Sequence, residues 1–187
     1  MNEMLDLIKQ RRSIRKFEQK EISQEVLNTI FESVQWSQSW ANTQCWELMV
    51  IKNTEIRERL KSLISPKNPA TNAITNSTIL LGLVAKLKIS GYYKDIPVTK
   101  LNDWFMFDIG IAAQNICMTA HSMGLGSVIV GAFDHEKAKE VLSIPDHYEL
   151  VVLIPIGYPA KISSPPARKN LKDFIHYDKF FNYSDES

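Results

Sequence analysis

The sequence predicts a single α+β domain that ends in a C-terminal arm. Four short runs rich in apolar and β-branched residues alternate with segments whose apolar residues recur at helical spacing, which is typical of strands and helices that share a core. A length of 187 residues fits about one domain. No internal repeat, low-complexity tract or linker divides the chain, so we expect one domain over residues 1–187, with residues 165–187 as its extension.

The expected strands are short apolar runs bounded by turn residues. They lie at residues 46–52, 78–85, 127–132 and 149–156. Beyond these runs, Pro165 and Pro166 stop regular structure. Residues 171–183 are rich in aromatic side chains but follow no helical or strand period, which indicates an arm laid over another surface.

Capping residues mark where the expected helices begin. Ser23 precedes residues 24–34, in which apolar side chains recur at helical spacing. Asn53 or Thr54, and later Asp134, are placed to cap two further helices.

The longest expected helix covers residues 101–123 and lies at the centre of the protein. It is apolar on nearly every side and contains no proline and no glycine other than Gly110. Gly124 follows it as a helix C-cap. The order here is helix, glycine loop, strand, which is the reverse of a dinucleotide-binding Rossmann motif, so that fold is not expected. Gly131, at the end of the third run, would let a flat ligand approach the backbone.

The composition argues against several functional classes. Lys and Arg number 22 against 21 Asp and Glu, so the net charge of +1 creates no overall field that would attract nucleic acid. Cys45 and Cys117 form no CxxC pair, which fits reduced thiols. Residues 1–12 lack the apolar stretch of a signal peptide, and no apolar run approaches the roughly 20 residues that span a membrane. We therefore expect a soluble cytoplasmic protein without membrane or nucleic-acid partners.

The chain has no motif for metal binding or for a nucleophile. Its four histidines show no HxxxH or HExxH spacing and join no cysteine cluster, so no metal site is expected. No GxSxG signature occurs, and we name no catalytic side chain. If the protein is an enzyme, a bound cofactor must carry the chemistry.

Residues 11–17 (RRSIRKF) are the most informative stretch. Within it lie three arginines, a lysine and a serine, namely Arg11, Arg12, Ser13, Arg15 and Lys16. Guanidinium forks and small hydroxyl donors suit a phosphate monoester, and Arg168 on a proline-stiffened loop could converge on the same phosphate. A solvated basic turn would produce the same pattern.

Residues 37–46 are dense in amide and hydroxyl groups, among them Ser39, Asn42 and Gln44. Amide side chains offer paired donors and acceptors, which the edge of a flavin pyrimidine or a polar substrate requires. A capping and turn segment would use the same residue types, so this alternative stays open.

Taken together, these stretches resemble the nitroreductase family of flavoproteins over almost the whole chain. The order and spacing of the motifs carry the resemblance, rather than any one of them. In chain order, residues 11–17 look like the family's RRSxRxF motif, 36–46 its APSxxNxQPW segment, 108–127 its long helix with a GLGS ending, 152–159 its strand ending in GxP, and 165–168 its PxxR.

The resemblance implies a nitroreductase-like fold with a central, mainly antiparallel sheet flanked by helices. It also implies a homodimer in which the C-terminal arm is exchanged and the 101–123 helix lies at the interface. The cofactor it implies is FMN. Arg11, Arg12 and Ser13 would hold the FMN phosphate and ribityl chain, and Arg168 would be a second phosphate clamp.

The remaining cofactor contacts are also carried over from the resemblance. Arg15 would reach the N1 and O2 edge of the flavin, and backbone groups of Val130 and Gly131 would face N5. Three side chains would contact the flavin of the neighbouring subunit, namely Ser39, Asn42 and Gln44.

Three positions within residues 37–46 set this chain apart. Gln38 and Cys45 stand where the family motif has proline, which leaves the loop backbone less rigid. Trp40 is bulky and would narrow the pocket.

The implied activity is that of an oxidoreductase that works by a ping-pong mechanism. NAD(P)H would deliver hydride to the flavin and leave, after which a nitroaromatic, a quinone or a similar acceptor would be reduced. One alternative is a relative that consumes flavin or removes halogens. Another is a flavin-binding storage or sensor protein without turnover. A small nucleic-acid-binding domain that uses the basic cluster is disfavoured by the balanced charge.

Overall fold

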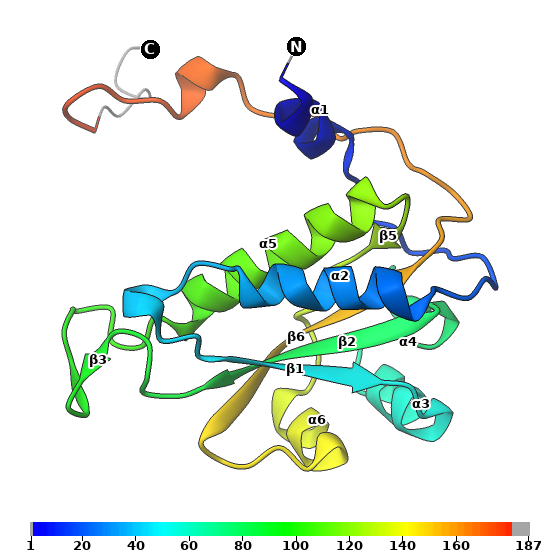
Figure 1. Ribbon diagram of the computed structural model, residues 1–187, viewed down its shortest axis with the longest axis horizontal. Coiled ribbons are helices and arrows are strands. Elements are labelled where there is room, and N and C mark those ends of the chain that lie inside the picture. Colours follow the sequence, from blue (N-terminus) through cyan, green and yellow to red (C-terminus); the bar gives the residue numbers. More distant parts are fainter. Residues whose placement is uncertain (1, 181–187) are drawn as a thin grey trace.

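The structure is a computed structural model that describes residues 2–180. Its centre is an antiparallel four-stranded sheet in the order β1, β2, β6, β5 (Figure 1). These strands span Trp46–Ile51, Ile79–Lys86, Tyr148–Gly157 and Gly126–Ser127 in that order. A separate hairpin pairs β3 (Tyr92–Tyr93) with β4 (Ile96–Pro97). The predicted α+β fold with a central antiparallel sheet is confirmed.

Helices cover both faces of the sheet (Figure 1). α2 (Gln24–Gln35) and α5 (Phe105–Ser122) pack on one face. α3 (Thr54–Ser62), α4 (Ala73–Asn76) and α6 (His135–Leu142) pack on the other. α1 (Glu3–Gln10) buries no side chain, and two short 3-10 helices complete the described chain, η1 (Trp40–Asn42) and η2 (Leu171–Asp173).

The central strand β2 joins the two halves of the core. Leu81 and Leu83 pack with α2 and α5, whereas Leu80 and Val84 pack with the helices of the opposite face. A strand buried on both faces has no place for polar residues, and β2 reads ILLGLVA before its last residue.

The predicted helix caps are confirmed. The side chains of Ser23, Asn53 and Asp134 accept hydrogen bonds from the backbone N–H groups three residues on, at 3.3, 3.0 and 3.2 Å. At the end of α5, Gly124 has a φ of 76° and the N–H of Leu125 donates to the carbonyl of Ala120 at 2.9 Å, which forms the expected glycine cap.

The long helix begins four residues later than the sequence pattern predicts, at Phe105 instead of residue 101. Asn102 has a φ of 58°, which no helix accommodates, and the N–H of Trp104 donates to the carbonyl of Ser90 at 3.0 Å. Asp103 then accepts from the N–H of Phe105 at 3.1 Å. The apolar residues before Phe105 therefore belong to a turn held by contacts with a distant segment.

The predicted strand at residues 127–132 is also wrong in extent, because the observed strand β5 covers only Gly126–Ser127. Regular pairing stops after β5, and only an isolated bridge between Val130 and Leu153 follows. The reason lies in β6, where the carbonyl of Pro155 accepts from the N–H of Val128 at 3.4 Å but the proline has no N–H to return. The edge ladder is thus interrupted at that position.

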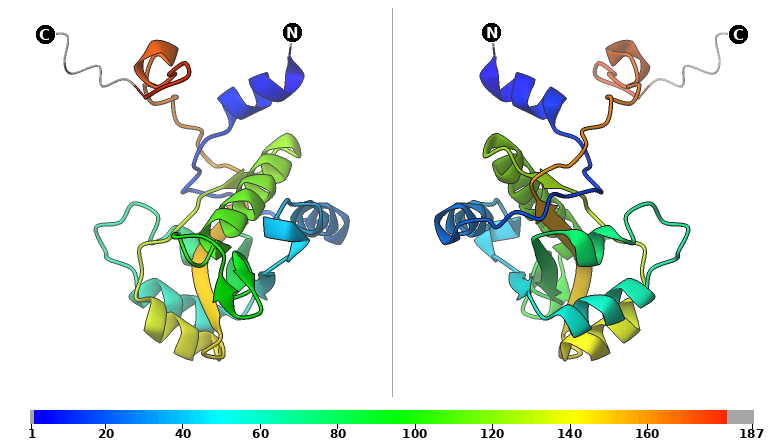
Figure 2. Two further views of the ribbon diagram at one scale, coloured as in Figure 1. Left: turned by 90° about the vertical axis from the view of Figure 1, so that its left-hand side faces the viewer. Right: turned by 90° about the vertical axis from the view of Figure 1, so that its right-hand side faces the viewer.

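After β6 the chain leaves the sheet and forms the C-terminal arm (Figure 2). Apart from η2, residues 160–180 contain no helix or strand. Six large apolar side chains of this segment are exposed, namely Ile162 and, beyond Arg168, Leu171, Phe174, Ile175, Tyr177 and Phe180. Phe181 and Tyr183, which belong to the same predicted arm, lie outside the described residues. Within residues 2–180, no helix has both the length and the apolar character needed to cross a membrane.

Candidate functional site

The basic segment at residues 11–15 runs alongside the edge strand β5. Ser13 forms a parallel bridge with Ser127, and the N–H of Ile14 donates to the carbonyl of Ser127 at 2.9 Å. A Cβ atom at Gly126 would lie only 2.5 Å from Cγ1 of Ile14. The second glycine of the GLGS stretch therefore allows the basic segment to approach the sheet.

Four arginines line one pocket of about 300 Å³ at this edge. Its lining residues are Arg11, Arg12, Ser13, Arg15, Ser163, Ser164, Pro166 and Arg168, none of which is acidic. The structure thus brings the N-terminal basic cluster and the late arginine together, as a shared phosphate site requires. Arg12 in addition donates to the carbonyls of Lys9 and Arg11, at the C-terminal end of α1.

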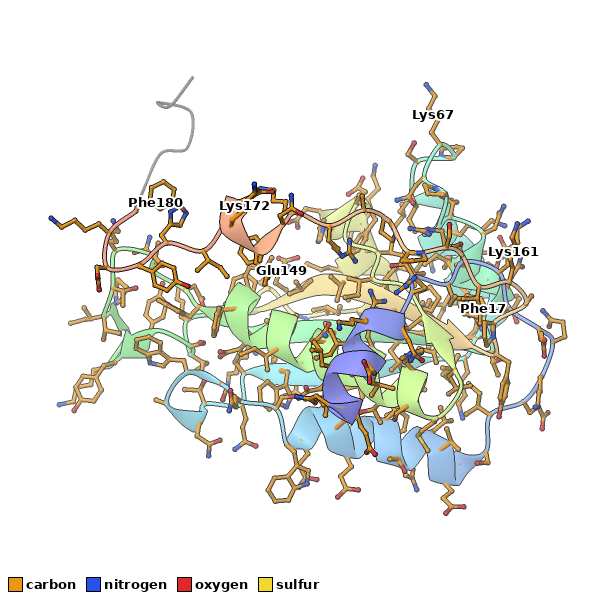
Figure 3. All side chains as sticks on the ribbon, turned by 90° about the horizontal axis from the view of Figure 1, so that it is seen from above. Phe17, Lys67, Glu149, Lys161, Lys172 and Phe180 are labelled. Carbon is orange, nitrogen blue, oxygen red and sulfur yellow. The ribbon has the colours of Figure 1, made fainter. Side chains whose placement is uncertain are left out.

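A larger pocket of about 770 Å³ adjoins the first and shares Ser13, Arg15 and Ser163 with it. Its other lining residues include Lys16, Phe17, Asn72, Asn76 and Lys161, and no carboxylate is among those that line it. In Figure 3, Phe17 and Lys161 lie close together at the end of the molecule opposite Phe180.

Asn72 and Asn76 were not predicted as site residues, although asparagines recur through residues 68–76. A buried arginine on α3 fixes their segment. Arg57 donates to the carbonyls of Ile74 and Ser77 at 2.7 and 2.6 Å, and to the hydroxyl of Ser77 at 2.7 Å. Burial lowers the pKa of Arg57.

The segment expected to face flavin N5 lies on the same edge of the sheet. Val130 is buried and exchanges two hydrogen bonds of 2.9 Å with Leu153, while Gly131 is exposed. His135 lies between two backbone carbonyls, with Nε2 3.0 Å from the oxygen of Gly131 and Nδ1 2.8 Å from that of Leu150, and its neutral ring can donate to one of them. A Cβ at Gly131 would make only ordinary contacts within the protomer.

The polar loop lies elsewhere. Ser39, Asn42 and Gln44 line a separate pocket of about 490 Å³ together with Trp36 and Gln38, and this pocket shares no residue with the two basic pockets. In Figure 1 the loop at η1 lies at the end of the molecule near β3, whereas the segment that follows α1 lies at the opposite end. One protomer therefore does not bring the two groups of predicted site residues together.

The polar loop is joined to the core by Asp108 of α5, a residue that the sequence reading did not single out. Asp108 is fully buried, and its Oδ1 accepts from the backbone N–H of Trp40 at 3.0 Å. The thiol of Cys45 lies 3.5 Å from Oδ2. Burial and the neighbouring Asp108 raise the pKa of Cys45 to about 12, so this cysteine remains a thiol at neutral pH.

The fold is α+β with an antiparallel sheet, and a pocket at the edge of this sheet is lined by four arginines and no carboxylate. Such a pocket is suited to a phosphate-bearing ligand. The chain belongs to the nitroreductase family, whose profile matches residues 8–158. It is an oxidoreductase of that family.

Named relatives cover most of the chain. A protein of Methanothermobacter thermautotrophicus with the provisional name NADH dehydrogenase/NAD(P)H nitroreductase is 29% identical over 184 residues, which is 95% of this chain and 88% of the relative. The FMN reductase (NADPH) of Bacillus subtilis is 25% identical over an alignment that covers 97% of this chain and 76% of the relative. The crystal structure of a nitroreductase family protein from Clostridium novyi superimposes with a TM-score of 0.74 at 30% identity, over 83% of this chain and 84% of the other.

Proposed function

We propose that this protein is an FMN-dependent oxidoreductase that takes hydride from NAD(P)H and reduces nitroaromatics, quinones or similar acceptors by a ping-pong mechanism. The observation that carries the proposal is the four-arginine pocket, which opens beside a larger pocket that shares Ser13 and Arg15 with it. We assign a terminal phosphate to the first pocket and a ring system to the second. The name of the Bacillus subtilis relative, FMN reductase (NADPH), supports the same cofactor and reductant.

The donor set fits a phosphate monoester. Such a group carries close to two negative charges and is bound best by guanidinium forks and hydroxyls. We assign Arg11, Arg12 and Ser13 to the phosphate and ribityl chain and Arg168 to a second clamp. No carboxylate lines the pocket to oppose this charge.

When bound, FMN supplies the hydride-accepting and hydride-donating chemistry, and the protein supplies binding and electrostatics. We assign Arg15 to the N1 and O2 edge, where a cation stabilises the charge of the reduced ring. The backbone of Val130 and Gly131 is assigned to N5. No side chain is given the role of catalytic acid or base, because solvent can supply protons.

We further propose that residues 1–187 form one domain, with residues 165–187 as an arm exchanged in a homodimer. Ser39, Asn42 and Gln44 would then contact the flavin of the neighbouring subunit. The position of the two groups at opposite ends of the protomer supports this, because a twofold axis could bring the loop of each subunit beside the basic pockets of the other. Each dimer would then hold two composite sites.

The test is the visible spectrum of the purified protein before and after anaerobic addition of NADH or NADPH. The proposal expects flavin bands, FMN and not FAD on extraction, and bleaching by at least one nicotinamide. Re-oxidation by a nitroaromatic or a quinone should restore the bands. Extraction of FAD, or no uptake after incubation with FMN, would overturn the cofactor assignment. Bound FMN that neither nicotinamide bleaches would instead identify a storage or sensor protein.

A further inference from the structure

We propose that Asp108 is a positioning residue that holds the polar loop, residues 39–44, in the conformation that presents Asn42 and Gln44 to the flavin. The inference rests on the proposed function for the identity of the ligand. The contacts that carry it lie within one protomer.

The first observation is the cost of burying Asp108. Its side chain is fully buried on α5, and within residues 2–180 no lysine, arginine or histidine forms an ion pair with it. A buried carboxylate is costly unless it accepts good hydrogen bonds. Its two oxygens face Trp40 N–H, 3.0 Å away, and the thiol of Cys45, 3.5 Å away. Trp40 lies near the start of the polar loop, and Cys45 follows directly after its end.

The second observation is the backbone of the loop itself. Ala41, Asn42 and Gln44 have φ angles of 44°, 55° and 48°, in the left-handed region that L-residues other than Asn and Asp rarely adopt. Asn42 tolerates this region, but Ala41 and Gln44 are strained there and persist only when the surroundings hold them. Within the loop, Ser39 Oγ accepts from Gln44 N–H at 3.0 Å, but this bond does not reach the core. Asp108 connects the loop to the core near its start, and its contact with the thiol of Cys45 adds to the hydrogen bond that the carbonyl of Cys45 accepts from the N–H of Lys86 at 2.7 Å.

The third observation is that the same loop is held by an aromatic contact. The ring centroids of Trp40 and Trp104 lie 5.0 Å apart, and Trp104 Nε1 donates to the hydroxyl of Thr99 at 2.8 Å. Trp104 directly precedes α5, one turn before Asp108. Displacing the loop would change the geometry of this tryptophan pair, which makes the pair an optical reporter that needs no flavin.

Cys45 makes this connection specific to the chain. A proline at this position, as in the motif that the sequence resembles, has no side-chain donor for Asp108. The buried thiol does, and its raised pKa, about 12, keeps it protonated. The thiol thus takes over part of the rigidity that a proline would provide.

The experiment compares wild type with Asp108→Asn, which keeps the shape but removes the charge. Near-ultraviolet circular dichroism of the flavin-free protein is measured first, with Trp104→Phe used to assign the band of the tryptophan pair. We expect Asp108→Asn to lose this band, and to raise the FMN dissociation constant by about tenfold, the usual scale for a hydrogen bond to a charged group. The flavin absorption maxima should shift, because the ring loses its contacts while the phosphate keeps its own.

Two controls separate positioning from general stability. Ile116→Val removes one methyl from a fully buried side chain on the same helix and should lower the melting temperature without changing the band or the dissociation constant. In an Asn42→Ala, Gln44→Ala background, Asp108→Asn should have little further effect on FMN affinity, because it acts through these two side chains.

The inference fails if Asp108→Asn keeps the tryptophan band, the FMN affinity and the flavin spectrum of wild type, even with a lowered melting temperature. If Asp108→Asn yields no folded protein, Cys45→Ser and Cys45→Ala decide. Serine keeps a donor and should keep the band, whereas alanine should weaken it, and equal bands in the two would overturn the inference. Failure of wild type to bind FMN would refute the proposed function instead, while the flavin-free band still tests the role of Asp108.

Discussion

Arginine serves two separate purposes in this protein, and burial distinguishes them. Arg57 is 8% exposed and donates hydrogen bonds to the carbonyls of Ile74 and Ser77, so its role is structural. Arg15 is exposed, and among residues 2–180 its one hydrogen-bond acceptor is the carbonyl of Ser13 at 3.3 Å. A guanidinium with free donors beside a pocket can bind a ligand, whereas one enclosed by carbonyls cannot.

Substitution of Arg15 tests its assigned place at the flavin edge. Arg15→Ala should slow flavin reduction by about tenfold or more, because it withdraws a cation that favours the reduced, negatively charged ring. FMN retention should change less, since the phosphate contacts bind both redox states alike. Stopped-flow reduction and equilibrium FMN titration measure the two effects. Lys52→Ala removes one positive charge outside the pockets and should change neither, and an unchanged reduction rate in Arg15→Ala would refute the assignment.

His121 makes stability dependent on pH. Burial, followed by the charges of Arg11 and Arg12, lowers its pKa in the folded protein below the unfolded value of 6.5. The unfolded chain then binds the proton more readily, so this contribution to stability is complete above about pH 6.5 and is lost as the pH falls toward the folded pKa. Urea unfolding of the flavin-free protein at several pH values should show this loss. His121→Gln should reduce it, and identical pH profiles would contradict the prediction.

At the scale of elements, Gly126 controls whether the basic segment can lie against the sheet. The added methyl of Gly126→Ala would lie 2.5 Å from Ile14 Cγ1 and must displace the segment. We expect a loss of stability of about 1–3 kcal/mol, typical of overpacking. FMN affinity should fall as well, because Ser13 and Arg15 flank the displaced residue. Denaturant unfolding and FMN titration measure both effects.

Gly110→Ala is the matched control for Gly126→Ala. Gly110 lies within α5, and a Cβ there would meet no atom within 4 Å in the protomer. The substitution should therefore increase stability, by about 0.5–1 kcal/mol for a helix position. Equal effects of the two substitutions on FMN affinity would show that the approach of Ile14 to Gly126 is not what shapes the pocket.

Elements set by neighbouring residues were predictable from the sequence, and those set by distant contacts were not. Ser23 and Asp134 cap helices through bonds to residues three positions on, so their role is local. The start of α5 depends on Ser90, and the short β5 depends on Pro155, both remote in sequence.

The same distinction holds for the site. The basic cluster could be predicted because its arginines are close together in sequence, and the late arginine could be joined to it because both suit a phosphate, as the resemblance also implies. Asp108 could not, because it meets Trp40 across 68 positions and is one of several polar residues in a mainly apolar helix. Asn72 and Asn76 lacked a signal that distinguishes ligand-facing asparagines from those of a turn.

At the scale of the whole molecule, the arm runs from the basic pockets toward the opposite end of the protein. Lys161 lies beside Phe17 at one end in Figure 3, Lys172 lies farther along, and Phe180 lies at the other end. Pro166 and Arg168, among its first residues, line the basic pocket together with Ser163 and Ser164, which precede the arm. The arm thus combines a stretch that shapes the pocket with an exposed apolar stretch beyond it.

We expect truncation after Arg168 to yield monomers that lose flavin. The truncation keeps the part of the arm that lines the pocket and removes the exposed apolar stretch beyond it. Its five described apolar side chains are 37–84% exposed within the protomer. Burying such side chains at about 1.5–3 kcal/mol each would contribute on the order of 10 kcal/mol before ordering entropy is subtracted. Sedimentation of the truncated and full-length proteins, with flavin absorbance recorded across the boundary, measures assembly and cofactor together.

The alternative is an arm that folds back on its own subunit, and a second variant separates the two arrangements. Tyr177→Ser and Phe180→Ser together keep the chain length but remove two of the most exposed apolar side chains. If these side chains bury against a partner, the double variant should dissociate at higher protein concentration than wild type, since each lost side chain weakens association and not the protomer. If the arm covers its own subunit, the same variant should lower the unfolding midpoint and leave the dissociation constant of the dimer unchanged. A truncated protein that remains a flavin-loaded dimer as stable as the full-length one would show that the arm does not join the subunits.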